Sequence, residues 1–175
     1  MANNTTRTVA LEAIYSVIIN KKSLSAFNYS EDSDIALIKS LVFGTIRFYH
    51  QLNDIVSKQL KHSLKKEDLD IHCLMLLGAY QLLYSKNATH TSIFKTVNVV
   101  NTLRTKALMN ATFRQVDRDK KILQQQVHYS HPSWLVKKVK RDYPNDFETI
   151  FKQNNTQAPM TIRVHVSLNL DHYQQ

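Results

Sequence analysis

The chain is poor in the residues that build tight turns, disulfides and metal sites. Its 175 residues include two glycines, three prolines and one cysteine, Cys73. A single cysteine excludes an internal disulfide framework and any zinc site built on cysteines, as expected in a reducing compartment. Two glycines cannot form the glycine-rich loops that cradle phosphates. Few turn residues and only one stretch with strand alternation predict a mainly α-helical fold.

The chain also lacks a long apolar segment. The stretch 71–85 is one of the two longest without Asp, Glu, Lys or Arg, and it is too short to cross a bilayer and rich in Leu and Met. It predicts a central buried helix. Because glycine inside a helix costs about 1 kcal/mol relative to alanine, Gly44 and Gly78 predict places where another helix approaches closely. The N-terminus, MANNTTRTV, has no apolar secretory leader, so we expect a cytoplasmic protein without a membrane partner.

Positive charge is concentrated in the second half of the chain, whose net charge overall is +9. Residues 1–90 carry ten Lys and Arg against eight Asp and Glu, whereas residues 91–175 carry thirteen against six. A regional basic field favours a polyanionic partner, with nucleic acid ahead of an anionic membrane. The alternative is a basic surface that only keeps the protein in solution.

Apolar periodicity predicts helices over most of the chain. The segments are 5–20, 34–60 (one long helix or two joined near His50), 91–104, 106–126, 134–143 and a last helix from about 146. Suitable caps are Ser33 for the second segment, Thr91 or Ser92 for the next, and Ser133 for the helix at 134–143. Asn145 and Glu148 have the spacing of a capping box.

One face of the predicted helix 106–126 is basic. Asn110, Arg114, Arg118 and Lys121 are spaced i, i+4, i+8 and i+11, which places them on one side. Such a row can hold phosphates while the amide reaches a base edge or a backbone group. The alternative is a solvated face in which Arg114 or Arg118 pairs with Asp117. In the helix at 134–143, further cations crowd one region: Lys137, Lys138, Lys140 and Arg141.

No catalytic, metal or cofactor site is predicted within the chain. His128 and His131 lack a matching pair of carboxylates or thiols, so they do not complete a metal site. Cys73 lies in an apolar helix and is expected to be a small core residue rather than a nucleophile.

The stretch 160–166, MTIRVHV, alternates apolar and polar residues and predicts a strand. A single strand cannot satisfy its own backbone groups, and no second strand is evident, so its partners are expected beyond Gln175. The alternatives are an edge strand in a dimer and a disordered tail. We therefore expect two parts: a helical domain over 1–127, and linker helices with the first strand of an incomplete subdomain over 128–175.

Several segments taken together resemble a known family. GTIRFYHQLNDIVSKQL (44–60), LLGAYQLLYS (76–85) and KALMNATFRQ (106–115) resemble the recurring segments of the NusB-type helical RNA-binding fold. HPSWLVKKVKRDYP (131–144) and NNTQAPMTIRVH (154–165) are similar to the connection in the 16S ribosomal RNA cytosine-C5 methyltransferase B (Sun or Fmu) family. In that family a NusB-like domain precedes an S-adenosylmethionine-dependent catalytic domain.

The resemblance implies a parent enzyme that methylates C5 of a cytidine in 16S ribosomal RNA with two cysteines. Neither cysteine motif is in this chain, and Cys73 matches no catalytic position, so only RNA binding is carried over. The implied RNA-binding residues are Arg7, Asn110, Arg114, Arg118 and Lys121, to which the basic helix adds Lys137, Lys138 and Arg141. The position of Ala107 is commonly glycine in the family, so the local approach there can differ.

These observations lead to three hypotheses. The first is an RNA-binding N-terminal portion that positions 16S ribosomal RNA for a catalytic domain of the same parent protein and binds no S-adenosylmethionine itself. The second is a free-standing NusB-type transcription antitermination factor. The third is a protein-interaction domain whose basic surface meets an acidic partner.

Overall fold

The computed structural model describes residues 6–29, 34–60, 62, 64–85, 90–125 and 129–156, and within these ranges every regular element is helical. This confirms the all-α prediction. The α-helices are α1 (Thr6–Ile18), α2 (Ile35–Arg47), α3 (Tyr49–Gln59), α4 (Leu69–Tyr84), α5 (His90–Val97), α6 (Leu103–Gln125), α7 (Ser133–Asp142) and α8 (Phe147–Asn154). Two 3₁₀ turns, η1 (Leu24–Ala26) and η2 (Lys66–Asp68), precede α2 and α4.

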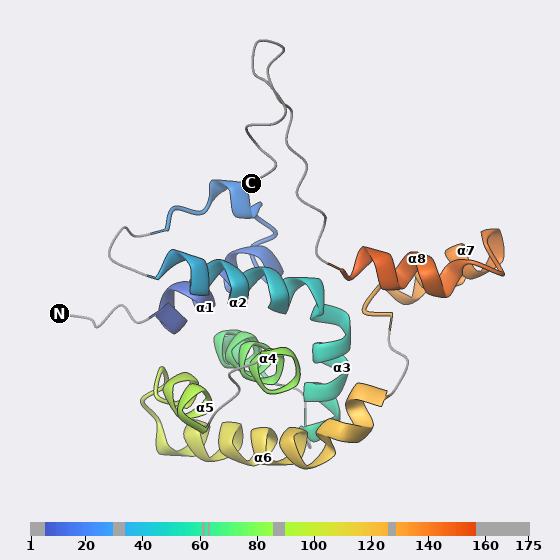
Figure 1. The fold of residues 1–175 in the computed structure, drawn as a ribbon. Coiled ribbons are helices and arrows are strands. Elements are labelled where there is room, and N and C mark those ends of the chain that lie inside the picture. The colour runs from blue at the N-terminus through green and yellow to red at the C-terminus, as the bar shows by residue number, and fades with distance from the viewer. Residues whose placement is uncertain are drawn as a thin grey trace, which may run out of the picture.

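Helix α4 lies at the centre of the bundle, as its lack of charge predicted. Figure 1 shows α1, α2, α3, α5 and α6 arranged around it, and each of these helices contacts it. Its buried residues occupy all sides of the helix, and they are Cys73, Leu74, Met75, Leu76, Leu77, Gly78, Ala79, Gln81, Leu82 and Leu83. A helix buried all round must be almost free of charge, which is why composition alone located it.

Both glycines lie where a neighbouring side chain fills the place of a Cβ, which confirms the predicted close approaches. A Cβ on Gly78 would overlap the ring of Phe113 from α6, and a Cβ on Gly44 would overlap the ring of Tyr80 from α4. Both glycines are buried. Each therefore lets an aromatic ring pack directly against a helix backbone.

The segment 34–60 forms two helices, and the break is at Phe48. The backbone of Phe48 leaves the helical region with φ −98° and ψ 17°. Its ring stacks on Tyr84 of α4, with centroids 4.1 Å apart and planes 8° apart. The Tyr84 hydroxyl donates to Gln51 Oε1 in α3. This aromatic contact holds the corner against α4, so the chain can wrap around the central helix.

Three expected boundaries in the first part of the chain were wrong. Thr91 and Ser92 do not cap the helix expected after them, because both lie inside α5, which begins at His90. Helix α2 is capped by Asp34, whose carboxylate accepts from the Leu37 backbone N–H at 3.0 Å; Ser33 lies outside the described residues. The helix expected to reach 104 ends at Val97, and α6 already begins at Leu103. The chain turns between them, yet Val100 still packs on the core. Periodicity therefore continued past the end of the helix.

The expected caps in the C-terminal part were also wrong. Ser133 is the first helical residue of α7 and not its cap, since Pro132 stands before it and no side chain caps that helix. Asp146 precedes α8, and no capping box forms at Asn145. The Glu148 carboxylate instead accepts from the Tyr129 hydroxyl at 3.5 Å. The predicted strand at 160–166 lies outside the described residues.

Helices α7 and α8 form a small unit beside the bundle (Figure 1). Its core is Phe151, which is buried against the rings of Tyr129 and His131. The Ser130 hydroxyl donates to the Arg47 carbonyl at 3.3 Å, which ties this unit to the end of α2. The division into 1–127 and 128–175 stays a prediction.

Candidate nucleic-acid interface

Helix α6 has one face in the core and one in solvent. Met109, Phe113 and Val116 are buried on the first face. All four residues of the predicted basic stripe, Asn110, Arg114, Arg118 and Lys121, are exposed. The structure therefore places these four residues on the face of α6 opposite its buried face. Packing of the apolar face onto α4 is what turns the cations outward.

The stripe is not neutralised by the pairings considered from the sequence. Neither Arg114 nor Arg118 pairs with Asp117 within the part of the chain that the structure describes; Arg118 Nη2 donates to Gln115 Oε1 instead. Gln115 in turn donates to Asp119 Oδ2 at 2.8 Å. A guanidinium has five N–H donors, so Arg118 keeps donors for a ligand. Exposed cations of this kind can bind phosphate oxygens.

Arg7 is not brought into this stripe. Its Nη2 donates at 3.5 Å to Gln81 Oε1 in the central helix, and Gln81 Nε2 donates onward to Thr96 Oγ1 at 3.0 Å. Desolvation by burial lowers the pKa of Arg7 from its ordinary value. Arg7 is half-buried and contacts α4, whereas the stripe points away from α4. Only a part of its guanidinium is available to a ligand.

Helix α7 exposes the second group of predicted cations. Lys137, Lys138 and Arg141 are all exposed, at spacings that place them on one face. Arg141 Nε donates to Asp142 Oδ1 at 2.8 Å, and this hydrogen bond is the main cause of the lowered pKa of Asp142. Surface pairs of this kind contribute little stability and compete weakly with a polyanion.

Lys140 differs from the other cations of α7 because its ammonium contacts aromatic rings of the protein. Its ammonium lies 5.1 Å from the ring centroid of Tyr129 and 4.8 Å from that of Phe147. These cation–π contacts hold α7 against the small core of the unit. Lys140 is exposed, but its ammonium lies over protein rings, so it is not counted among the candidate RNA contacts.

Sequence reasoning missed Trp134, which shares the exposed face of α7. It is the first of four residues spaced i, i+3, i+4 and i+7, the other three being Lys137, Lys138 and Arg141. Two-thirds of its surface is exposed, at 67%. The same spacing argument that found the α6 stripe would have found this one.

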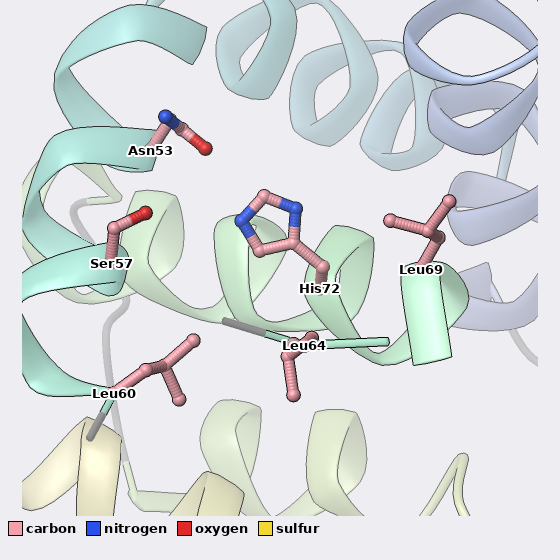
Figure 2. A pocket seen from close by; sticks show the side chains of 6 residues that line it. All are labelled: Asn53, Ser57, Leu60, Leu64, Leu69 and His72. Atoms are coloured by element: carbon pink, nitrogen blue, oxygen red, sulfur yellow. The ribbon is translucent and has the colours of Figure 1, made fainter. Parts of the chain in front are cut away.

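A hollow of about 280 Å³ is lined by residues of α3 and α4 and by Leu60 and Leu64, which lie between these helices in the chain. Figure 2 shows its lining, with the His72 ring facing the side chains of α3; the residues are Asn53, Ser57, Leu60, Leu64, Leu69 and His72. Burial lowers the pKa of His72, so the ring is neutral at pH 7. Among the described residues no hydrogen bond joins His72 to Ser57 or Asn53.

Cys73 is buried in the core, as expected, and burial raises the pKa of its thiol to about 12. A thiol with this pKa is protonated at pH 7 and inert as a nucleophile. No group of three His, Cys, Asp or Glu residues in the described ranges gathers as a metal site. None of the helices described is both long and apolar enough to span a bilayer.

Comparison with known proteins gives matches along nearly the whole chain. Residues 4–118 match the NusB family. The chain belongs to the NusB family. A second match, over residues 131–173, is to the ferredoxin-like domain of RsmF/B-like methyltransferases. The NusB match covers α1 to most of α6, and the second begins just before α7.

Individual relatives of this NusB-family chain carry one recurring description. The chain is 36% identical over 172 residues to a "Ribosomal RNA small subunit methyltransferase B" of Proteus mirabilis, covering 90% of this chain and 40% of the relative. It is 34% identical over 175 residues to a "Probable ribosomal RNA small subunit methyltransferase B" of Coxiella burnetii, covering 94% and 40%. A "Ribosomal RNA small subunit methyltransferase B" of Yersinia pseudotuberculosis is 34% identical over 172 residues, covering 90% of this chain and 40% of the relative. The chain thus spans about two-fifths of the length of these relatives.

Proposed function

We propose that this chain is the RNA-binding N-terminal portion of a small-subunit ribosomal RNA methyltransferase. The observation that carries the proposal is the outer face of α6, where Arg114, Arg118 and Lys121 are exposed beside Asn110. A row of cations on one rigid helix can bind successive phosphates, and an amide among them can reach a base edge or a backbone group. The relatives at 34–36% identity are described as ribosomal RNA methyltransferases, so we infer that the polyanion bound by these cations is RNA.

The chemistry would be performed by a catalytic domain of the same parent protein, outside these 175 residues. That domain would bind S-adenosylmethionine and methylate C5 of a cytidine in 16S ribosomal RNA. The helical domain would add affinity and orient the RNA, and Lys137, Lys138 and Arg141 would extend the contact surface. Arg7 would contribute less, because its guanidinium is partly engaged with Gln81. Such an enzyme would work in the cytoplasm without a membrane partner.

A free-standing antitermination factor is the second candidate, since the NusB match alone would suit it. The match of residues 131–173 to a methyltransferase-associated domain favours the first candidate. A protein-interaction domain with an acidic partner predicts little response to RNA.

Salt dependence of RNA binding tests the proposal. Affinity for a 16S ribosomal RNA fragment should fall steeply with salt, because bound phosphates release counterions. The double variant Arg114→Ala/Arg118→Ala should weaken binding and flatten the logarithmic salt slope by about one unit per lost contact. Lys65→Ala/Lys66→Ala is the matched control, since it removes the same charge from the exposed η2 segment. Equal affinity of both double variants would remove the α6 stripe from the interface.

Calorimetry with S-adenosylmethionine tests whether cofactor binding lies outside this chain. The chain should give no binding signal, because cofactor binding is assigned to the other domain. A saturable signal would contradict this proposal.

A further inference from the structure

Trp134 is an exposed aromatic side chain in a strongly basic setting. It is the single tryptophan of the chain, and 67% of its surface is exposed. A lone exposed apolar residue needs no explanation by itself. The cations beside Trp134 on the surface of α7 are what suggest a ligand.

The four outward residues of α7 form one continuous face. Trp134, Lys137, Lys138 and Arg141 follow each other at helical spacing, and all are exposed. The opposite side of α7 is half-buried and faces the protein through Leu135, Val136 and Val139. The helix is thus amphipathic, and the tryptophan stands on its cationic side. We call these four residues the α7 face.

We propose that the α7 face is a single-stranded RNA subsite, in which the Trp134 indole stacks on an unpaired base and Lys137 and Lys138 bind the flanking phosphates. This proposal rests on the proposed RNA-binding function and names the part of the RNA that α7 takes. Aromatic rings stack on every base, so the contact is tolerant of sequence, and neighbouring cations hold the backbone.

Charge favours an RNA partner over a protein surface for this face. Three of its four residues are cations, whereas the centres of protein interfaces are depleted of lysine. Helix α7 also begins without a capping side chain, so its N-terminal end adds positive potential beside Trp134. Only residues 126–132 separate α7 from α6, a reach of less than about 30 Å. One RNA strand can therefore engage both helices.

The single tryptophan makes the proposal directly measurable by its own fluorescence. The free chain should emit like a water-exposed indole and be quenched by iodide. Addition of oligoadenylate should quench the emission with the same midpoint as anisotropy of the labelled oligonucleotide. An abasic oligonucleotide of equal length supplies the phosphates without bases, and it should bind more weakly with little quenching.

Variants separate stacking from folding. Trp134→Ala should weaken oligoadenylate binding roughly tenfold, as expected for the loss of one stacked base, while Trp134→Phe should retain most of the affinity. Phe94→Ala is the matched control, because Phe94 is equally exposed, at 66%, on α5. Circular dichroism of each variant should show unchanged helix content, and an effect of Phe94→Ala equal to that of Trp134→Ala would overturn the proposal.

The outcomes distinguish this inference from the proposed function. RNA binding with unchanged Trp134 emission, together with wild-type affinity of Trp134→Ala, would overturn the subsite and leave RNA binding intact. Failure of both RNA fragments and oligoadenylate to bind would overturn both proposals. An indole that iodide cannot reach in the free chain would show that protein covers the face, which also overturns the subsite.

Discussion

Helices α4 and α7 are opposites in composition and in surroundings. Helix α4 has ten buried residues, contains no Lys or Arg, and contacts five other helices of the bundle. Helix α7 has no buried residue and carries four cations among its ten residues. Burying a charged side chain costs free energy, so the buried helix α4 has few charged residues. On the exposed helix α7 the charged side chains stay solvated and cost little. If the proposed RNA contacts are correct, stability and RNA binding depend on separate parts of this molecule.

Helix α6 combines both characters on its two faces. Phe113 packs against Gly78 in the core, and its sequence neighbour Arg114 points to solvent. Adjacent substitutions on α6 should therefore have opposite consequences. The four predictions that follow test how far the two properties can be separated.

Loss of the Phe113 ring should have the largest effect on stability. Phe113→Ala removes a buried ring between α4 and α6, so the free energy of unfolding should fall by about 3–5 kcal/mol. Urea denaturation followed by circular dichroism measures this. Under conditions in which the variant is folded, its affinity for RNA should equal that of the wild type. Reduced RNA affinity of the folded variant would show that stability and RNA binding are not independent.

The two helix glycines should differ in their tolerance of a methyl group. Gly78→Ala overlaps the buried Phe113 ring and should cost about 1–3 kcal/mol. Gly44→Ala should cost less, because it meets the outer end of Tyr80, which is only half-buried and can shift. The same denaturation experiment compares them. Combining Gly78→Ala with Phe113→Leu should give a smaller loss than the sum of the single losses; strict additivity would mean that the two sites do not touch.

A smaller effect is expected from the protonation of His72. Burial lowers its pKa below the usual 6.5, so the ring is neutral in both states above that pH and binds a proton first in the unfolded state as the pH falls. Wild-type stability should therefore decline below about pH 6.5 relative to His72→Gln. The measurement is the difference in unfolding free energy between the two proteins from pH 7.5 to pH 5. A gap that stays constant would contradict the lowered pKa.

The smallest effect on stability should come from the basic stripe. Arg114→Ala and Lys121→Ala remove exposed side chains that form no hydrogen bond or ion pair with the described residues, so stability should change by less than about 0.5 kcal/mol. Thermal denaturation provides the measurement. A larger loss would mean that the stripe has a structural role and that the cationic faces, like α4, contribute to stability.

Local sequence signals predicted the helices well and their ends poorly. Charge depletion located α4, and periodicity located the buried face of α6. The ends depended on partners distant in sequence: Phe48 breaks the second helical segment by stacking on Tyr84, and Val100 stays in the core after α5 has ended. A pattern of apolar residues records burial, and burial can continue where the helix does not.

The candidate site divides in the same way. The α6 stripe followed from spacing, because residues on one exposed face of a helix share their surroundings. Arg7 could not be judged by spacing, since its half-burial depends on Gln81, which is 74 positions away. Trp134 carries a spacing signal, but its importance depends on an exposure that only the packing of α7 reveals.

The sequence by itself determined that this protein is helical, where its core helix lies, and which helix faces are cationic, because these follow from periodicity and from the cost of burying charge. The tertiary structure decided which cations remain available. Packing against α4 turns Arg114 outward and draws Arg7 inward, and contacts with aromatic rings engage Lys140. Contacts between residues far apart in the chain set the exposure of each group, and no local pattern encodes them.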